Sequence, residues 1–462
     1  MSKYPKFAVV GHPNKGKSSI VASLSLDNSI QIGDTPGTTQ VKRAFPLKVD
    51  GKIVYELFDT PGFQRARRVF AWLEEHGDVS ADKRANVVRE FVFKHKESEQ
   101  FRDEVELLEP ILNGAGIIYV VDASKPYGAE YEVEMEILRW CGQPSMAILN
   151  LIGNEDYRED WTRALGQYFR LVRTYNPMTA RHNEHVELLE SMAQLKEEWT
   201  KPIKQAITIL DELYDKKVDE SVDTVVDYMV EVLSFVHKEK IKEEEASDDE
   251  KEEAKLAYRK KILQLEKKER QAIEKIWNHG DIEKNEASLE LERVGLFSKE
   301  SASIFGLTQK ELILTSAATG ATAGAAIDLL AVGHTLLLGA LVGGVVGGVG
   351  AMFSFDNLYE MKVLGQTIGK RELTIGPMQN LNFPYILLGR SLYHASMIAK
   401  RSHAMRGDLD LENGSFTQEL MEGESRKALE KLHLKLRKGE ELKEETLEEY
   451  KQLIKKRFLT LL

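Results

Sequence analysis

The stretch of sequence that decides the fold is GHPNKGKS, residues 11–18, which fits the pattern G-x-x-x-x-G-K-[ST]. The apolar run at residues 7–10 predicts a β-strand before it, and residues 18–24 predict a helix after it. A glycine-rich loop in this setting turns backbone N–H groups inward, where they can hold phosphate oxygens. The flanking strand and helix therefore favour a phosphate-binding loop over a simple tight turn.

Two side chains of this loop have predicted chemical roles. The ammonium group of Lys17 would neutralise the β and γ phosphates of a nucleotide, and the hydroxyl of Ser18 would bind Mg²⁺. The other predicted nucleotide-binding residues of the loop are Gly11, His12, Pro13, Asn14, Lys15, Gly16 and Ser19.

A second motif, Asp59-Thr60-Pro61-Gly62, follows another apolar run at residues 53–58. A carboxylate at the end of a strand can hold the Mg²⁺ shell through water, and the N–H of Gly62 can sense a γ-phosphate. By itself the motif fits a type I turn with Pro61 at the second position equally well. The phosphate-binding loop upstream favours the functional interpretation, so Asp59 and Gly62 join the predicted site.

Between the two motifs lies Gly37-Thr38-Thr39. Nucleotide switches use one loop threonine to complete the Mg²⁺ shell while the γ-phosphate is present. Thr39 is the first choice for this role and Thr38 the second; a polar turn is the alternative for this segment alone. The predicted catalytic residues are then Lys17, Thr39 and Gly62, and the predicted Mg²⁺ ligands are Ser18, Thr39 and Asp59.

Taken together, GHPNKGKSS, PGTT and DTPG resemble the Era/TrmE branch of translation-factor-related P-loop GTPases, over about 180 residues. The resemblance implies an α/β domain with a mostly parallel sheet and helices on both faces. It also implies GTP and GDP as ligands, Mg²⁺ as cofactor, and hydrolysis of GTP to GDP and phosphate. In several members an asparagine at the position of Asn14 helps to bind an activating K⁺; a role in shaping the loop is the equal alternative here.

The position after the DxxG glycine departs from the Ras-like pattern. Ras-like enzymes place a glutamine there to orient the attacking water, whereas this chain has Phe63, with Gln64 one residue later. Water activation would then come from a monovalent cation, a dimer partner or a partner protein. Slow intrinsic turnover is the expectation.

The base-reading motif N-K-x-D also departs from the family, because the chain reads Asn150-Leu151-Ile152-Gly153 and only Asn150 matches. A missing aspartate removes a charge-assisted contact to guanine. Nearby Glu155 or Asp156 could substitute for it. The choice of guanine over adenine is therefore left open by this motif.

The sequence as a whole predicts three regions. Residues 1–182 form the GTPase domain, 183–300 a charged helical region, and 301–462 a C-terminal helical domain. Apolar runs between turn residues predict the strands of the first region at 7–10, 53–58, 117–121, 146–149 and 171–175. A charged helical run at 81–108 predicts either a partner-docking insertion or extra helical packing.

Composition narrows the class of protein. The formal net charge of −11 weighs against a nucleic-acid-binding role. The single cysteine, Cys141, excludes a disulfide framework and is expected to be a packing residue. No secretory h-region precedes the first motif, so the N-terminus is expected in the cytoplasm.

An apolar, glycine-rich stretch at residues 317–355 is interrupted by Asp328 and His334. Glycines four residues apart let helices approach closely, as in membrane helix pairs. Three interpretations stay open: a hairpin inserted in a membrane, a hairpin buried in a soluble domain, and a self-association surface. The first would attach the protein to the cytoplasmic face of the inner membrane.

The C-terminal part resembles a poorly characterised bacterial family that joins an Era-like GTPase domain to a domain of unknown function. The segments that carry this resemblance are LTIGP at 373–377, NFPYILLGRSL at 382–392 and RSHA at 401–404. The final residues predict an amphipathic helix, because Leu447, Tyr450, Ile454 and Phe458 lie three or four positions apart.

The sequence thus predicts a GTP-hydrolysing switch whose helical region engages a membrane or protein partner. A homodimer is one way to supply the missing water activation. One alternative is a nucleotide-gated scaffold with little hydrolysis. The other is an RNA-related assembly GTPase, against which the acidic balance weighs.

Overall fold

The computed structural model describes residues 4–25, 43–49, 52–241, 246–277, 291, 294–298, 301, 304–306, 359–365, 371–400 and 423–462. Thr38, Thr39 and the glycine-rich stretch 317–355 lie outside these residues. The chain divides into two compact units. The first comprises Met1–Tyr214 and Lys400–Arg406, and the second Asp215–Ala399 and Gly407–Leu462.

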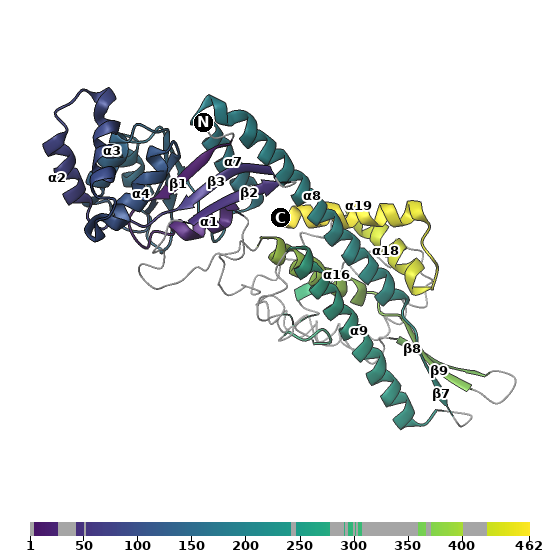
Figure 1. Ribbon diagram of the computed structural model, residues 1–462. Helices are drawn as coiled ribbons and strands as arrows, with labels where there is room; N and C mark the ends of the chain where they lie inside the picture. Colours follow the sequence, from purple (N-terminus) through teal and green to yellow (C-terminus); the bar gives the residue numbers. More distant parts are fainter. Residues whose placement is uncertain are drawn as a thin grey trace, which may run out of the picture. The chain divides into compact units, whose positions relative to one another are not determined.

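A six-stranded sheet in the order β2-β3-β1-β4-β5-β6 forms the centre of the first unit (Figure 1). Its strands are β1 (Lys6–Val10), β2 (Arg43–Val49), β3 (Lys52–Asp59), β4 (Gly116–Asp122), β5 (Ser145–Asn150) and β6 (Leu171–Thr174). Every pairing is parallel except β2 with β3. The predicted α/β domain with a mostly parallel sheet is confirmed, and all five predicted strands are present.

The antiparallel strand β2 was missed. Its sequence RAFPLKV has Pro46 at its centre, and a proline weakens a strand prediction because it cannot donate to the ladder. The structure places β2 at the edge of the sheet, where one side of the strand needs no partner.

Helices cover both faces of this sheet (Figure 1). They are α1 (Lys17–Ser25), α2 (Ala66–His76), α3 (Arg84–Lys94), α4 (Arg102–Leu112), α5 (Glu130–Trp140), α6 (Arg158–Leu165) and α7 (His182–Ala193), with short 3₁₀ turns η1 (Ala81–Lys83) and η2 (Glu99–Phe101). Alternate residues of a strand point to opposite faces. Ala8 and Val10 therefore pack with α2 to α6, while Phe7 and Val9 pack with α1 and α7.

The predicted helical run at 81–108 folds into η1, α3, η2 and α4. Leu73 of α2, Val88 and Phe91 of α3, and Leu108 of α4 are completely buried in one apolar cluster. These helices belong to the core of the first unit, and the choice between docking and packing roles stays a prediction.

Cys141, directly after α5, is buried as expected of a packing residue. Its Sγ donates to the carbonyl oxygen of Ile137 at 3.4 Å. Burial disfavours the thiolate and raises the pKa of the Cys141 thiol to about 12.

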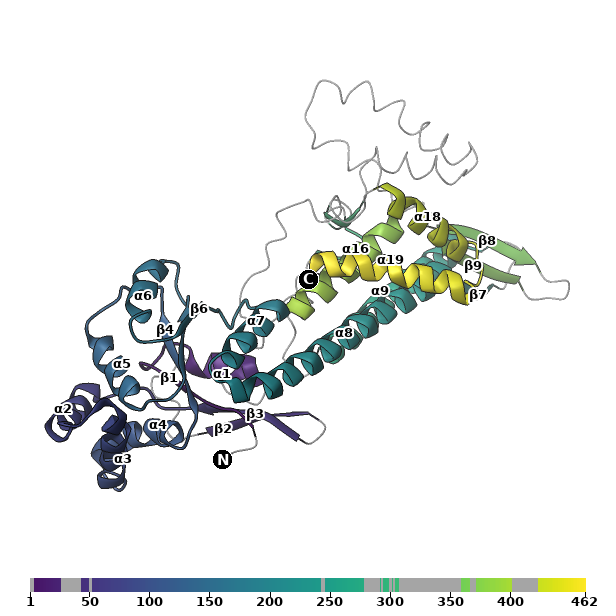
Figure 2. The same cartoon turned by 90° about the horizontal axis from the view of Figure 1, so that it is seen from above.

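The second unit is largely helical and holds a small antiparallel sheet in the order β7-β9-β8 (Figure 2), which was not predicted. Its elements are β7 (His237–Ile241), α9 (Asp248–Ile276), β8 (Tyr359–Gly365), β9 (Arg371–Met378), α16 (Phe383–Lys400), α18 (Gly423–Arg437) and α19 (Glu444–Leu461). The long helix α8 (Glu197–Ser234) contributes to both units, since the division falls between Tyr214 and Asp215. We predicted a domain boundary near residue 182, and that boundary stays a prediction.

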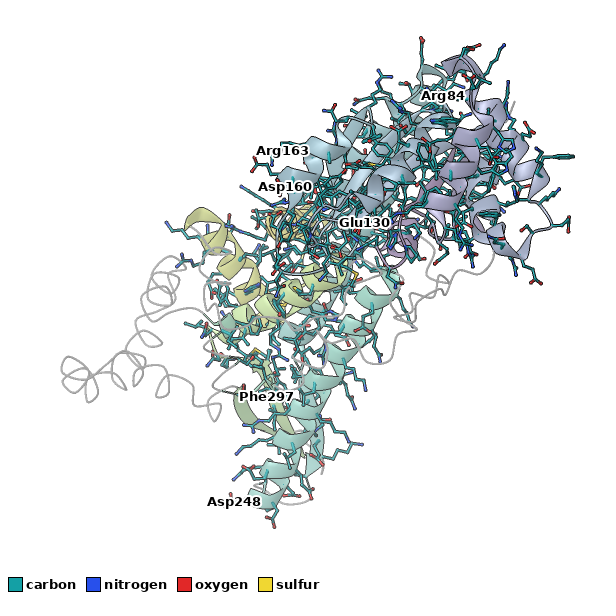
Figure 3. All side chains as sticks on the ribbon, turned by 90° about the vertical axis from the view of Figure 1, so that its left-hand side faces the viewer. Arg84, Glu130, Asp160, Arg163, Asp248 and Phe297 are labelled. Carbon is teal, nitrogen blue, oxygen red and sulfur yellow. The ribbon has the colours of Figure 1, made fainter. Side chains whose placement is uncertain are left out.

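Helices α8 and α9 run antiparallel in this unit. The indole of Trp277 donates to Ser221 Oγ at 3.0 Å, and Lys261 pairs with Glu231 at 4.0 Å. Ser247 caps the start of α9 by accepting from the N–H of Glu250. Asp248, Asp249 and Glu250 form the first turn of α9 (Figure 3 labels Asp248), where the helix dipole stabilises negative charge.

The C-terminal amphipathic helix is confirmed as α19, whose residues Tyr450, Ile454 and Phe458 are buried. Within the described part of the chain, no helix combines the length and the apolar character needed to cross a membrane.

Candidate nucleotide-binding site

The loop between β1 and α1 adopts a conformation that depends on its glycines. Gly11 and Gly16 have φ values of +140° and +84°. A Cβ at Gly11 would lie 2.4 Å from the carbonyl oxygen of Val120, and one at Gly16 would lie 2.3 Å from Asn150 Nδ2. Side chains at either position would push the loop away from the ends of β4 and β5. Asn14 also adopts a left-handed conformation, with φ of +60°.

Lys17, the first residue of α1, folds back over this loop. Its Nζ donates to the carbonyl oxygen of His12 at 2.9 Å, and the residue is only 8 % exposed. Burial lowers the pKa of Lys17 to about 8, while the negative charges of Asp59 and Glu134 oppose that shift. The ammonium group is thus held at the loop in a position where a bound phosphate would restore its preference for the charged form.

The predicted Mg²⁺ ligands Ser18 and Asp59 lie together, although they are far apart in the sequence. Ser18 Oγ donates to Asp59 Oδ2 at 2.8 Å, and Asp59 is 3 % exposed at the end of β3. Thr60 fixes the chain just after Asp59 by donating from Oγ1 to the carbonyl oxygen of Val9 at 2.8 Å. A hydroxyl and a carboxylate oxygen are ligands that Mg²⁺ prefers, so the residues present fit this ion.

Gly62 lies directly against the phosphate-binding loop. A Cβ at Gly62 would be 2.6 Å from the backbone nitrogen of Pro13. The DTPG segment can therefore reach the loop only with a glycine at this position. The structure brings Gly62, Asp59, Ser18 and Lys17 to one edge of the sheet, while Thr38 and Thr39 fall outside the described residues.

Asn150, at the end of β5, joins the same edge from the other side. Its Nδ2 donates to the carbonyl oxygen of Lys15 at 3.2 Å. The side chain thus ties β5 to the phosphate-binding loop. The chain after β5 is held by Asn176, whose Nδ2 donates to the carbonyl oxygen of Leu151 at 3.2 Å.

A buried carboxylate under the loop was missed in the sequence. Glu134 of α5 is 3 % exposed; His12 Nδ1 lies 2.9 Å from its Oε1, and Tyr119 donates its hydroxyl to Oε2 at 2.9 Å. The sequence does hint at this burial, because Glu134 lies on the apolar face of α5, between Tyr131 and Leu138 at helical spacing.

A second missed carboxylate, Glu104 of α4, holds the segment that follows Gly62. Its Oε1 accepts from the backbone N–H groups of Gln64 at 3.0 Å and Arg65 at 2.6 Å, and the residue is completely buried. Phe63, in the position of the Ras-like glutamine, is 2 % exposed and packs in the apolar cluster of α2 to α4.

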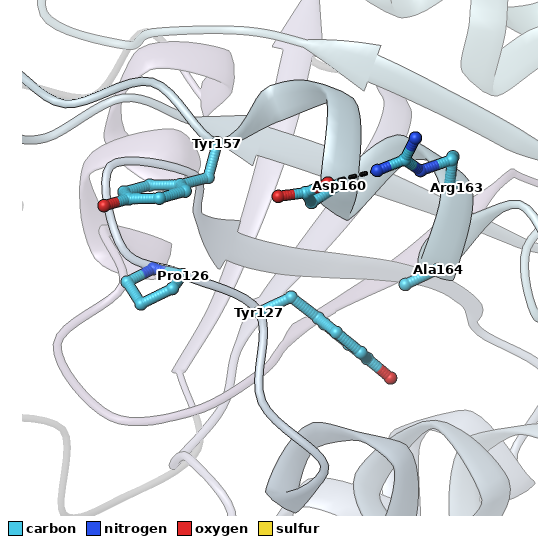
Figure 4. Close-up of a pocket in the computed structure, with 6 residues that line it drawn as sticks. All are labelled: Pro126, Tyr127, Tyr157, Asp160, Arg163 and Ala164. Carbon is cyan, nitrogen blue, oxygen red and sulfur yellow. Dashed lines mark hydrogen bonds and ion pairs between the residues drawn. The ribbon is translucent and has the colours of Figure 1, made fainter.

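A surface pocket lies between the loop after β4 and helix α6 (Figure 4). Its lining consists of Pro126, Tyr127, Tyr157, Asp160, Arg163 and Ala164. None of the predicted site residues lines it, and Asp160 pairs with Arg163 within it. Among the described residues, no group of three or more His, Cys, Asp or Glu side chains is arranged to hold a metal ion.

Residues 162–460, more than half of the chain, match the family model "Domain of unknown function (DUF3482)". The chain belongs to the DUF3482 family. In this DUF3482 protein, residues 6–151 match a second model, described as "50S ribosome-binding GTPase". The predicted combination of a GTPase domain with a C-terminal domain of unknown function is confirmed at this level.

The DUF3482 chain is also similar to proteins named "GTPase Der". The protein from Aromatoleum aromaticum is 40 % identical over 87 residues, which are 18 % of this chain and 20 % of that protein. The protein from Azoarcus sp. is 39 % identical over 87 residues, with the same shares of 18 % and 20 %. The protein from Erwinia tasmaniensis is 32 % identical over 136 residues, 29 % of this chain and 26 % of that protein. The chain thus spans about a quarter or less of the length of these relatives.

Proposed function

We propose that the chain binds GTP and GDP and hydrolyses GTP to GDP and phosphate as a molecular switch. The observation that carries this proposal is the Ser18–Asp59 contact of 2.8 Å beside the loop that Lys17 closes. It joins a phosphate-binding loop to a carboxylate at the end of a parallel strand, as a nucleotide–Mg²⁺ site requires. The match of residues 6–151 to a GTPase model and the similarity to GTPase Der support guanine nucleotides as the ligands.

Each side chain has a role in this proposal. Backbone N–H groups of residues 11–18 hold the phosphates, and Lys17 neutralises the charge that develops on the β and γ phosphates. Ser18 and Asp59 would hold Mg²⁺, with Thr39 completing its shell. Bound Mg²⁺ would neutralise negative charge on the phosphate oxygens. The N–H of Gly62 would bind the γ-phosphate, so that its loss on hydrolysis changes the segment after it.

Hydrolysis is proposed to be slow. Phe63 is buried in the α2–α4 cluster and carries no polar group, so it cannot orient a water molecule. By resemblance to the Era/TrmE branch, K⁺ bound near Asn14 would supply the positive charge that activates hydrolysis. The left-handed conformation of Asn14 shapes the loop with or without K⁺. A homodimer or another partner protein is the other source of activation.

The second unit is proposed to read out the nucleotide state by engaging a protein partner or the cytoplasmic face of the inner membrane through the stretch 317–355. The alternative is a nucleotide-gated scaffold that binds GTP and hydrolyses little of it. The burial of Phe63 favours this second candidate. Both candidates need the same phosphate-binding loop and differ only in turnover.

Multiple-turnover phosphate release by the full-length chain tests the proposal, with GTP and Mg²⁺ in K⁺ buffer and in Na⁺ buffer. We expect slow release that K⁺ accelerates and that Lys17→Ala abolishes, because one phosphate-neutralising charge is lost. GTP binding without turnover in either buffer would favour the scaffold. No binding of GTP or GDP by the wild-type chain would refute both candidates.

A further inference from the structure

A closed set of contacts links the loop residue Lys15 to the ends of β4 and β5. Asp122 ends β4 directly opposite Asn150 of β5. Its Oδ1 accepts from the backbone N–H of Ser124 at 3.0 Å and from Ser124 Oγ at 2.5 Å. Its Oδ2 lies 3.8 Å from Lys15 Nζ, and the carbonyl oxygen of Lys15 accepts from Asn150. Ser124 is therefore held in one position by the framework of the site.

This fixed serine stands against Gly153, the residue in the place of the base-reading aspartate. A Cβ at Gly153 would lie 3.0 Å from Ser124 Oγ and 3.3 Å from Ser124 Cβ. Ser124 is 2 % exposed, so it has little room to move aside. Gly153 is not among the residues with a positive φ. A side chain at position 153 is therefore opposed by a tight contact with Ser124 and not by backbone strain.

The carboxylates that follow Gly153 in the chain already have partners. Glu155 accepts from the hydroxyl of Tyr157 at 3.1 Å. Asp156 holds the guanidinium of Arg158, with a shortest contact of 2.7 Å. These contacts direct both groups to neighbouring residues of their own loop, so neither is arranged to replace the aspartate.

An apolar side chain lies at the same place instead. Ile152 is 55 % exposed, and its Cδ1 would be 3.9 Å from a Cβ at Gly16 in the phosphate-binding loop. An exposed isoleucine beside the loop offers a surface on which a flat base can rest without any hydrogen bond. Apolar contact of this kind does not distinguish purines by their amino groups.

We propose that the Ser124–Asp122 pair excludes a carboxylate from position 153, so that this chain binds purine nucleotides without recognising the 2-amino group of guanine. The inference rests on the proposed function, because it needs a nucleotide in this loop. GTP and ITP differ only by that 2-amino group. The chain therefore binds the two with nearly equal affinity.

Competition between GTP and ITP on the full-length chain with Mg²⁺ tests the inference. We expect the dissociation constants for ITP and GTP to differ by less than about fivefold. A site that hydrogen-bonds the 2-amino group would bind ITP, which lacks that group, far more weakly than GTP. A preference for GTP above about fivefold would overturn the inference and leave the proposed function standing. A chain that binds neither nucleotide would overturn the proposed function, and the inference with it.

Three variants test the role of Ser124. Gly153→Asp alone should gain no preference for GTP over ITP, because its side chain meets Ser124. Ser124→Gly alone should keep the wild-type ratio, because no carboxylate has been added. Ser124→Gly combined with Gly153→Asp should raise the preference for GTP to about tenfold or more, since the carboxylate then has room. A folded double variant with the wild-type ratio, checked by its thermal unfolding, would show that Ser124 is not the obstacle.

Discussion

The charge of Lys17 depends on whether a phosphate lies beside it. In the nucleotide-free chain its pKa is lowered to about 8 by burial, so a large fraction of the side chain is neutral above that pH. A bound phosphate favours the ammonium form and raises this pKa again. Between the two pKa values, binding of nucleotide must take up a proton, and affinity falls as the pH rises.

The resulting prediction concerns affinity for GDP between pH 7.5 and 9. We expect the affinity to fall above about pH 8, by up to about tenfold per pH unit, as measured by titration calorimetry. Binding at pH 8.5 should also take up protons, which two buffers of different ionisation enthalpy would detect. Lys17→Arg is the control, because arginine stays charged over this range. Any effect of the nucleotide's own ionisation would be the same for this variant and for the wild type. An equal pH dependence in that variant would contradict the prediction.

Sequence motifs predict some residues of the candidate site and miss others. Lys17, Ser18, Asp59 and Gly62 were predicted from short patterns, and the structure brings them together. Glu104 was not predicted, because it meets its partners across 39 and 40 positions of the chain. A single carboxylate in a helix reveals such a partner only when the fold is known.

Among the elements, α4 has a direct connection to the nucleotide edge. Glu104 anchors the two residues that follow Phe63, and Arg65 Nη1 donates to the carbonyl oxygen of Gln100 in η2, just before α4, at 2.8 Å. The segment after Gly62 is therefore attached to a helix of the core, and a change at Gly62 must either move α4 or break these bonds.

We expect Glu104→Ala to release this segment. Two partly buried N–H groups would lose their acceptor, which costs about 1–3 kcal/mol and corresponds to roughly fivefold or faster amide exchange at Gln64 and Arg65. Hydrogen exchange read by mass spectrometry would measure it. Glu106→Ala is the matched control on the same helix, because Glu106 pairs with the exposed Arg102. Unchanged protection in Glu104→Ala would mean that these bonds do not hold the segment.

The predictable elements were those with a strong pattern. The buried parallel strands and the amphipathic α19 were predicted because their apolar residues recur at the period of the element. The strands β7 to β9 were missed. β7 has the sequence HKEKI, in which four of five residues are polar or charged, so its pairing with β9 gives no apolar signal. Such a strand is defined by the partner it pairs with.

In the whole molecule, the second unit has its own buried framework. Arg390 of α16 is 2 % exposed and donates to Glu266 of α9 at 2.6 Å, to the carbonyl oxygen of Leu291 at 2.9 Å and to Ser301 Oγ at 3.1 Å. Glu266 is 4 % exposed. The pair joins two helices that are far apart in the sequence, inside the region that the family model covers.

We expect Arg390→Met to destabilise the second unit by about 3–5 kcal/mol, because buried Glu266 loses the guanidinium that donates to it and keeps only Arg270, 4.0 Å from its other oxygen. Arg390→Met combined with Glu266→Gln should recover part of that loss. Lys451→Ala, which removes a more exposed pair with Asp223, is the control and should change little. Thermal unfolding of the full-length chain would measure these effects. Equal stability of the wild type and Arg390→Met would contradict the prediction.

The burial of Cys141 has a practical consequence for chemical labelling. The chain contains one thiol, and its pKa of about 12 leaves almost no thiolate at neutral pH. Maleimide reagents attack the thiolate, so the native protein should resist them. A cysteine introduced at an exposed position of each unit would then accept a fluorophore without any prior removal of the natural one. The distance between two such dyes, followed as GTP is added, would report in real time how the DUF3482 region responds to the nucleotide.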